Sequence, residues 1–476
     1  MLHPEIDKHK VWDCTLRMIV SRRIQQSNLS KMVSRSFLLL LFLSCFTVGC
    51  AATDYWVRPD SISDCNTRQP CLTLSEYVQN TSHYFTSNSV FHFLSGNHTV
   101  NKTTWVIIQD VENVFLVGSA GHATVQCSGR LSFTFEGVHG LQISNVGFIR
   151  CGLEQKGNLR SITLENGGRV QVALLFVECS SVVLENVEVM ESYGYDLIGY
   201  NMITVKLNHC LFHYNYWRIR DSNTQSFSTT IKNTIFTGGN ALFELEFNDK
   251  STTGTLNILH SEFAHGRSTL GHVGGGGLEI NIKTKDSTVC SEREAYNITV
   301  YNCSMYKNTA PVGANMLISI YMPLYSSMTI HIDNCKFFEG NSTSKGVGFM
   351  LQIESISYED EFLRLLSYTK NVTVYLENSE FYGNSAANGS GLYLGVESVH
   401  IPNAYCNFII QQCAFQGNTG EYGSGMYIFS DLTMDIFMMS IKDLIFVGNN
   451  ASTAGSAIYI DLKWFRNYFP SNNFHS

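Results

Sequence analysis

Residues 374–394 read Val374-Tyr-Leu-Glu-Asn-Ser-Glu-Phe-Tyr-Gly-Asn-Ser-Ala-Ala-Asn-Gly-Ser-Gly-Leu-Tyr-Leu394. An alternating run leads to Asn378, Phe381 follows three residues later, and a Gly-Ser-Gly turn precedes a second alternating run, Leu392-Tyr-Leu394. Alternation with a period of two is typical of strands that bury one face. The stretch therefore predicts short β-strands joined by tight turns.

The first half of this pattern recurs ten times, as a polar anchor followed three residues later by an apolar residue, usually Phe. The anchors are Asn145, Asn186, His209, Asn233, His260, Asn302, Asn334, Asn378, Gln412 and Asp443. A minimum period of 23 residues with variable insertions indicates a solenoid whose loops differ in length. Strands that pair with their equivalents in neighbouring coils would make an all-β, parallel β-helix of about ten or more coils.

The anchors have a structural explanation. Asparagine tolerates the left-handed backbone conformation that a tight turn needs, and stacked asparagines can hydrogen-bond along the solenoid axis. His209 and His260 occupy the same column. We therefore interpret these two histidines as turn residues rather than catalytic bases.

The cysteines follow the repeat. Residues after position 51 include eleven cysteines, an odd number that leaves at least one unpaired or intermolecular. Cys65 and Cys71 are close in sequence and predict a local disulfide in the N-terminal region. Four cysteines share one column directly after the anchors: Cys210, Cys303, Cys335 and Cys413. A shared column favours stacked small core residues over disulfides or metal ligands. The absence of any Cys-x-x-Cys pair argues against structural zinc.

Four late copies extend the pattern to Phe-x-Gly-Asn, at 338–341, 381–384, 415–418 and 446–449, each followed by Gly-x-Gly or Gly-Ser-Ala. This signature resembles the repeats of polymorphic outer-membrane proteins and autotransporters, and more broadly the secreted right-handed parallel β-helix proteins of the pectin-lyase-like superfamily. The segment from Tyr55 to Val78, with Phe93–His98, resembles the N-terminal cap of metazoan members. The resemblance covers residues 53–465 and implies the fold, which carries lyases, hydrolases, adhesins and scaffolds alike.

The chain divides into five predicted segments. Residues 1–31 are interpreted as a doubtful extension before the true start at Met32. Residues 32–52 are interpreted as a signal peptide built on the apolar run 37–48; the alternative is an uncleaved signal anchor. Residues 53–100 form the cap, 101–465 the β-helix repeats, and 466–476 an irregular tail. Because no capping element is evident in this tail, we expect truncation or a missing downstream region.

Asn-x-Ser/Thr sequons also favour export. We predict glycosylation at Asn80, Asn97, Asn101, Asn297, Asn341, Asn371, Asn388 and Asn450. Asn302 is a poorer acceptor because it falls in a strand-turn unit. The net charge of −8 becomes more negative once residues 1–51 are removed, because they carry seven basic and three acidic side chains. An acidic surface argues against nucleic acid and anionic membranes as partners. No second apolar run is long enough to span a membrane.

Catalytic signatures are scarce. In the superfamily that this chain resembles, hydrolases acting on polygalacturonate carry adjacent aspartates, Gly-His-Gly and Arg-x-Lys. None of these motifs occurs here. Glu359-Asp360-Glu361 is interpreted as a solvated loop rather than a calcium site, and Gly274–Gly277 as a solenoid turn. The sequence thus predicts no cofactor and no bound metal.

The predicted binding surface is a column of outward aromatic residues. Tyr393, Tyr427 and Tyr459 each lie between two aliphatic residues after a Gly-Ser-Gly/Ala turn, and we place Phe243 in the same column. Such a strip suits sugar rings or a protein partner; the alternative is a ladder of stacked rings that only stabilises the sheet. We therefore expect a secreted or cell-surface binding, adhesion or scaffold module for extracellular glycans or proteins, without catalysis.

The alternative function is a polysaccharide lyase or glycoside hydrolase with a divergent site. Both functions leave the fold unchanged, so the fold cannot separate them. Convergence of several acids, or of an acid and an arginine, on the outer face of a sheet would favour the enzyme.

Overall fold

The structure is a computed structural model. It describes residues 52–59, 71–100, 104–119, 123–127, 131–155, 170–213, 216–221, 226–247, 253–268, 275–284, 294–322, 326–355, 370–398, 404–430 and 437–462. The chain separates into two units, Met1–Ala52 and Thr53–Ser476. The predicted extension and signal peptide lie outside the described residues except for Ala52, and so does the predicted tail.

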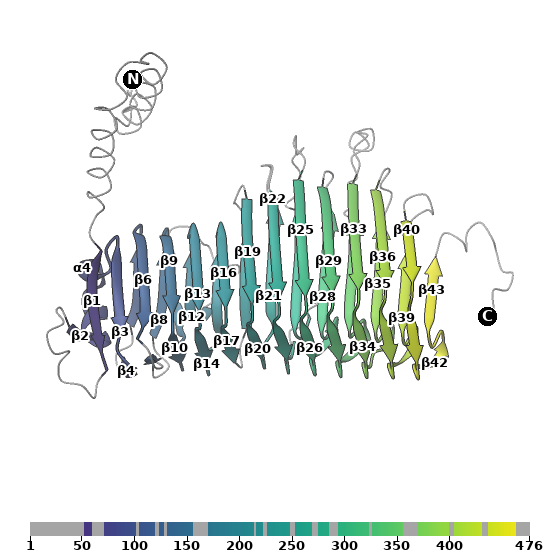
Figure 1. Cartoon of the computed structure of the whole chain (residues 1–476), viewed down its shortest axis with the longest axis horizontal. Coiled ribbons are helices and arrows are strands. Elements are labelled where there is room, and N and C mark those ends of the chain that lie inside the picture. Colours follow the sequence, from purple (N-terminus) through teal and green to yellow (C-terminus); the bar gives the residue numbers. More distant parts are fainter. Residues whose placement is uncertain are drawn as a thin grey trace, which may run out of the picture. The chain divides into compact units, whose positions relative to one another are not determined.

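Three long parallel sheets build the second unit, and their strands lie side by side along its length (Figure 1). Sheet A contains fourteen strands, in the order β2 (Cys71–Thr73), β1 (Thr53–Arg58), β3 (Ser89–Phe93), β6 (Glu112–Gly118), β9 (His139–Ser144), β13 (Ser181–Glu185), β16 (Thr204–Asn208), β19 (Ser226–Lys232), β22 (Thr253–Leu259), β25 (Glu294–Tyr301), β29 (Ser326–Asp333), β33 (Lys370–Glu377), β36 (Ala404–Gln411) and β40 (Phe437–Lys442).

Sheet B contains twelve short strands, β4 (Gly96–Thr99), β7 (Ala123–Gln126), β10 (Val146–Ile149), β14 (Glu188–Met190), β17 (Leu211–His213), β20 (Ile235–Thr237), β23 (Glu262–Ala264), β26 (Ser304–Tyr306), β30 (Lys336–Phe338), β34 (Glu380–Tyr382), β37 (Ala414–Gln416) and β41 (Ile445–Val447).

Sheet C contains thirteen strands, β5 (Thr104–Gln109), β8 (Leu131–Glu136), β12 (Val170–Val177), β15 (Tyr195–Tyr200), β18 (Tyr216–Asp221), β21 (Ala241–Phe247), β24 (Leu278–Thr284), β28 (Met316–Met322), β32 (Phe349–Ser355), β35 (Leu392–Ser398), β39 (Met426–Ser430) and β43 (Ile458–Leu462), with β11 (Leu153–Gln155) antiparallel to β12. Successive coils visit sheets A, B and C in turn, which confirms the predicted right-handed parallel β-helix.

The polar anchors make the turn from sheet A to sheet B. All ten have left-handed backbone conformations, with φ between 48° and 56°. Asn186 Nδ2 donates to Asn145 Oδ1 at 2.9 Å, and Asn334 Nδ2 donates to Asn302 Oδ1 at 3.0 Å. His260 Nδ1 lies 2.7 Å from Asn302 Nδ2, within the same column. The structure therefore confirms that these residues are turn residues.

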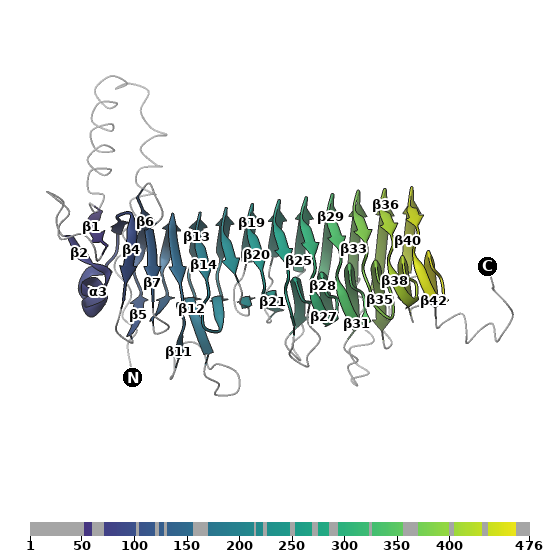
Figure 2. The ribbon, with the colours of Figure 1, turned by 90° about the horizontal axis from the view of Figure 1, so that it is seen from below.

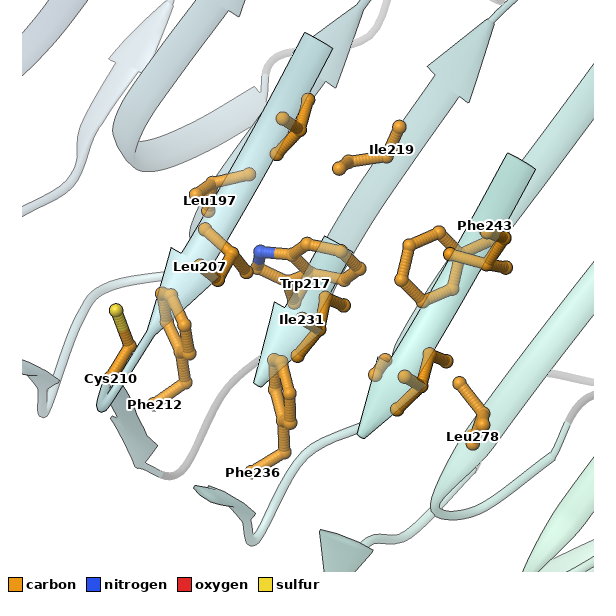
Figure 3. Close-up of a cluster of buried hydrophobic side chains, with 14 of the residues drawn as sticks. Leu197, Leu207, Cys210, Phe212, Trp217, Ile219, Ile231, Phe236, Phe243 and Leu278 are labelled. Atoms are coloured by element: carbon orange, nitrogen blue, oxygen red, sulfur yellow. The ribbon is translucent and has the colours of Figure 1, made fainter. Parts of the chain in front are cut away.

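The phenylalanines that follow the anchors fill the interior of the solenoid. Phe337, Phe381 and Phe415 are fully buried, and their rings stack at centroid distances of 4.8 and 4.7 Å. Phe212 and Phe236 stack in the same way at 5.1 Å in earlier coils (Figure 3). One repeated residue type therefore produces a continuous core along the solenoid.

A second, buried asparagine ladder runs through the Phe-x-Gly-Asn repeats. Asn384 Nδ2 donates to Asn418 Oδ1 at 3.0 Å, and Asn418 Nδ2 donates to Asn449 Oδ1 at 2.9 Å. Asn418 Nδ2 also donates to the Phe381 carbonyl at 3.0 Å. Each amide thus satisfies backbone groups that the turn from sheet B toward sheet C would otherwise leave buried without partners.

The N-terminal end carries the described helical turns: α3 (Leu74–Tyr77), η1 (Val78–Asn80) and α4 (Thr81–Tyr84). Thr73 begins α3 with a capping box that includes Glu76. The Tyr77 ring packs edge-on against Phe91 of β3 at 5.6 Å. In the described part of the chain, no helix is long and apolar enough to cross a membrane.

The cysteines divide into thiols and disulfides. Cys210, Cys303, Cys335 and Cys413 are buried and unpaired, as predicted. Cys71 is disulfide-bonded, whereas its predicted partner Cys65 lies outside the described residues. A disulfide that the sequence analysis did not predict joins Cys127 and Cys151, which follow the neighbouring strands β7 and β10; their Cα atoms lie 4.8 Å apart.

Candidate functional site

The predicted tyrosine column lies on the outer face of sheet C. Tyr393, Tyr427 and Tyr459 are register partners on β35, β39 and β43. Their aliphatic neighbours Leu392 and Met426 belong to the main core, whereas Tyr393 belongs to a separate apolar cluster. The outward orientation is therefore confirmed, while a role in binding stays a prediction.

This column is covered at Tyr393, whereas Tyr427 and Tyr459 are half-buried. Tyr393 is only 2% exposed and packs with Leu317, Met350 and Phe429. Two small sheets flank the start of sheet C: β27 (Thr309–Val312) with β31 (Asn341–Lys345), and β38 (Thr419–Tyr422) with β42 (Asn450–Ala454). Figure 2 shows these strands along the same side of the solenoid as β28 and β35. Lys345 Nζ lies 5.4 Å from the centre of the Tyr393 ring, and burial raises the pKa of the Tyr393 hydroxyl.

The tyrosine rings also stack on one another. Centroids of Tyr393 and Tyr427 lie 5.2 Å apart with an interplanar angle of 8°, and those of Tyr427 and Tyr459 lie 5.2 Å apart at 28°. A sugar ring usually packs on an aromatic face, and these faces are largely occupied by neighbouring rings. This stacking agrees with the alternative in the sequence analysis, a ladder of rings that stabilises the sheet, and the role of the column in binding stays a prediction.

The placement of Phe243 in this column was wrong. Phe243 is 1% exposed and packs in the core against Trp217, with ring centroids 4.6 Å apart (Figure 3). Its register partner is Ile280, and the residue in the tyrosine column is Leu242. The predicted column was placed one residue too far along β21. In a strand, a shift of one residue exchanges the two faces.

We expect Tyr393→Ser to destabilise the protein by roughly 1.5–3 kcal/mol, because it removes a buried ring. Tyr405→Ser is a matched control, since Tyr405 is 40% exposed on sheet A, and it should change stability by less than about 0.5 kcal/mol. Urea denaturation measures both values. Equal stability of the two variants would contradict the covered ladder.

Acids and an arginine do converge elsewhere on the outer face of sheet C. Arg218 on β18 donates from Nε to Glu244 Oε2 on β21 at 2.7 Å, and its Nη2 also contacts this carboxylate. The two side chains are 21% and 19% exposed. Burial opposes the charge of Arg218, but Glu244 outweighs it and raises the pKa of the guanidinium. This pair is therefore largely removed from water.

Glu279, on the adjacent strand β24, is the most unusual carboxyl group of this surface. It is 4% exposed although its side chain is on the outer face. Its Oε2 accepts from Asn240 Nδ2 at 3.2 Å and from the Gly275 amide at 3.1 Å, and its Oε1 accepts from Asn281 Nδ2 at 2.6 Å. Burial raises its pKa above the usual value, with a further contribution from Glu244 and partial opposition from the hydrogen bonds.

A row of polar residues continues from this cluster toward the tyrosines. Glu244, Asn281, Ser319 and Gln352 are consecutive register partners on β21, β24, β28 and β32. We define the polar strip as this row together with Arg218 and Glu279. Within it, Asn281 and Ser319 are only 9% and 5% exposed.

Titratable groups flank the polar strip. Lys283 Nζ lies 5.6 Å from the centre of the Tyr321 ring. Burial, followed by the negative charges of Glu354 and Glu279, raises the pKa of Tyr321. Burial and the neighbouring Glu397 raise the pKa of Glu354, which also accepts a hydrogen bond from Gln352.

The sequence analysis missed the polar strip, because its members come from five coils and share no local motif. The available signal was polar residues at alternate positions of otherwise aliphatic strands, as in Leu278-Glu-Ile-Asn-Ile282. Among the described residues no group of three or more acids, histidines or cysteines is placed to hold a metal ion. The predicted loop Glu359–Glu361 lies outside the described residues.

The predicted glycosylation sites lie mostly at the surface. The exposed asparagines are Asn80, Asn97, Asn297, Asn341, Asn371 and Asn450; Asn388 is half-buried, and Asn101 lies outside the described residues. Asn297 and Asn371 lie within strands β25 and β33 rather than in loops. Modification of these residues stays a prediction.

No protein-family model and no curated protein matches the chain. Among solved structures, the surface adhesin PfbA of Streptococcus pneumoniae is similar with a TM-score of 0.31 at 11% identity, over 81% of this chain and 87% of that one. The A-module of the Azotobacter vinelandii mannuronan C-5 epimerase AlgE4 gives 0.30 at 9% identity, over 81% and 94%. A mannuronic-acid-specific family 6 polysaccharide lyase from the human gut microbiota gives 0.27 at 10%, over 82% and 91%. This is a likeness of fold alone.

Proposed function

We propose that this protein is an extracellular β-helix that binds an extended glycan along the polar strip of sheet C. The observation that carries the proposal is a row of polar side chains on the outer face of sheet C: Arg218, Glu244 and Gln352 are partly exposed, and the buried Glu279 is held by three hydrogen-bond donors. A small number of positioned polar groups on one accessible face is typical of a binding site.

The chemistry of the polar strip suits a polymer rich in hydroxyl groups. Amide, hydroxyl and carboxylate side chains supply both donors and acceptors, as sugar hydroxyls require. Strands lie about 4.8 Å apart, so the four-residue row from Glu244 to Gln352 spans roughly 14 Å. This length favours an extended chain over a single small molecule.

Export supports an extracellular ligand. The predicted signal peptide and the sequons favour secretion, and the Cys127–Cys151 disulfide is typical of an oxidising compartment. The net charge of −8 does not favour a polyanion such as nucleic acid. A neutral or cationic glycan is therefore the favoured ligand class.

A glycan array with wild-type protein and the double variant Asn281→Ala/Gln352→Ala tests the proposal. We expect binding to weaken at least about tenfold, because losing roughly 1.4 kcal/mol of hydrogen bonding has that effect. Thr373→Ala, on β33 of sheet A, is the control and should bind as the wild type. Unchanged binding by the double variant, or binding of proteins but of no glycan, would contradict the proposal.

A second candidate is glycosidic-bond cleavage on the same strip. The specific observation is a pair of carboxyl groups in unlike environments: burial raises the pKa of Glu279, whereas Arg218 lies against Glu244. Register makes these two acids diagonal neighbours on one face. Glycosidases combine a protonated acid with a carboxylate base or nucleophile in this manner.

For this candidate, Glu279→Gln should abolish the release of reducing ends while leaving glycan retention measurable. Activity should fall as the pH rises through the raised pKa of Glu279, because a general acid must be protonated. A wild-type protein that retains glycans yet releases no reducing ends at any pH would exclude cleavage and support binding alone.

A further inference from the structure

Two buried thiols occupy equivalent positions in neighbouring coils. Cys303 follows the anchor Asn302, and Cys335 follows the anchor Asn334. Asn302 N donates to the Asp333 carbonyl at 3.0 Å, and Lys336 N donates to the Cys303 carbonyl at 2.9 Å. These bonds set the two cysteines directly opposite each other, one strand spacing apart, or about 4.8 Å.

Each sulfur atom is directed toward the preceding coil, and Cys303 Sγ lies 3.5 Å from the Ile258 carbonyl there. Cys335 Sγ lies 3.4 Å from the Val300 carbonyl, in the coil of Cys303, while Cys303 Sγ lies 3.3 Å from the carbonyl of the adjoining Tyr301. Both side chains are 1% exposed. Cα separations of 4.4–6.8 Å accommodate a disulfide, so the backbone does not have to move to join them.

This solenoid already bridges neighbouring coils elsewhere. The Cys127–Cys151 disulfide joins two adjacent coils whose Cα atoms are 4.8 Å apart. The other cysteines of the anchor column lack such a partner, since Thr234 lies opposite Cys210 and Ser379 lies opposite Cys413 in the neighbouring coil. Cys303 and Cys335 are thus the adjacent thiol pair of this column among the described residues.

We propose that Cys303 and Cys335 are an oxidation site that forms a second inter-coil disulfide. The oxidant is a disulfide of low molecular weight or of an oxidoreductase. One cysteine thiolate attacks it and releases one thiol, and the other cysteine thiolate then attacks the mixed disulfide and releases the second thiol. Two protein thiols and one disulfide become one protein disulfide and two thiols, so atoms and electrons balance.

The environment distinguishes the two sulfurs. The hydrogen bond between the two thiols lowers the pKa of Cys303. Burial, followed by the same hydrogen bond, raises the pKa of Cys335. In the folded protein, Cys303 is therefore the more readily ionised thiol of the pair. Because both groups are buried, the exchange occurs while the coils are still open.

The test is differential alkylation of full-length protein secreted into an oxidising medium. The protein is denatured without reductant, alkylated, reduced, alkylated with a second reagent of different mass, and mapped by mass spectrometry. We expect Cys303 and Cys335 to carry the second label and a cross-linked peptide to appear before reduction. Cys210 should carry the first label.

Two variants complete the test. In Cys303→Ser, Cys335 should change to the first label, and in Cys413→Ser the labelling of the pair should be unaffected. First-reagent labelling of both Cys303 and Cys335 in wild-type protein would overturn the proposal. So would a cross-link of Cys335 to any other cysteine.

Discussion

Replacement of Phe337 by alanine should destabilise the protein by roughly 3–5 kcal/mol, among the largest effects of any single substitution in this chain. Phe337 is completely buried and stacks on Phe381 at 4.8 Å. The solenoid cannot collapse onto the resulting cavity without breaking the backbone ladders on either side, so the loss includes a cavity cost as well as lost burial. Urea denaturation, followed by circular dichroism, measures the change.

The next residue provides a matched control. Phe338 is outward on sheet B, only half-buried, and stacked between Tyr306 and Tyr382 at 4.7 Å on each side. Phe338→Ala should cost about 0.4–2 kcal/mol, because cross-strand pairs contribute roughly 0.2–1 kcal/mol each. A larger loss for Phe338→Ala than for Phe337→Ala would show that the inward register is wrong.

Asn418→Ala should have a comparable effect, roughly 2–6 kcal/mol, through a different mechanism. The Asn418 side chain accepts from Asn384 N at 3.0 Å and donates to the Phe381 carbonyl, also at 3.0 Å. Alanine removes the Asn418 partner from this buried donor and this buried acceptor, at about 1–3 kcal/mol each. Hydrogen exchange should show lost protection of the Asn384 amide.

Asn378→Gly is the control for Asn418→Ala. Asn378 has φ of 48°, which glycine adopts freely, and its side chain makes an exposed hydrogen bond to Asp333. This variant should differ from the wild type by less than about 1 kcal/mol. Similar losses in both variants would show that the buried ladder contributes no more than the exposed one.

The sequence predicted the coil correctly where one residue type repeats in one local context. Ten anchors share a left-handed conformation, and the Phe residues after them are directed inward, because both features depend on a few neighbouring residues. Phe243 was placed wrongly because its turn differs from the late Gly-Ser-Gly turns by one position. In a strand, that single step changes an outward residue into a core residue.

The candidate site was less predictable. Arg218, Glu244 and Glu279 share a patch only because β18, β21 and β24 are adjacent, and insertions of unequal length separate these strands in the sequence. Tyr393 was correctly predicted to be outward, but its burial depends on Leu317, Met350 and Phe429 of other coils and on Lys345 over its ring. Outward orientation and exposure are different properties, and the alternating pattern predicts only the first.

By itself, the sequence determined that this chain is a β-helix, where each coil turns, which residues fill its interior, and that Cys210, Cys303, Cys335 and Cys413 share one column. These features repeat, and each copy is specified by local backbone preference and period-two burial. Only the tertiary structure decided that the Tyr393 ring is covered, that Cys127 joins Cys151, and that Glu279 loses contact with water. The physical reason is that burial, pKa and disulfide pairing depend on which coils become neighbours and on what lies over them, and both are set by strand register between residues far apart in the chain.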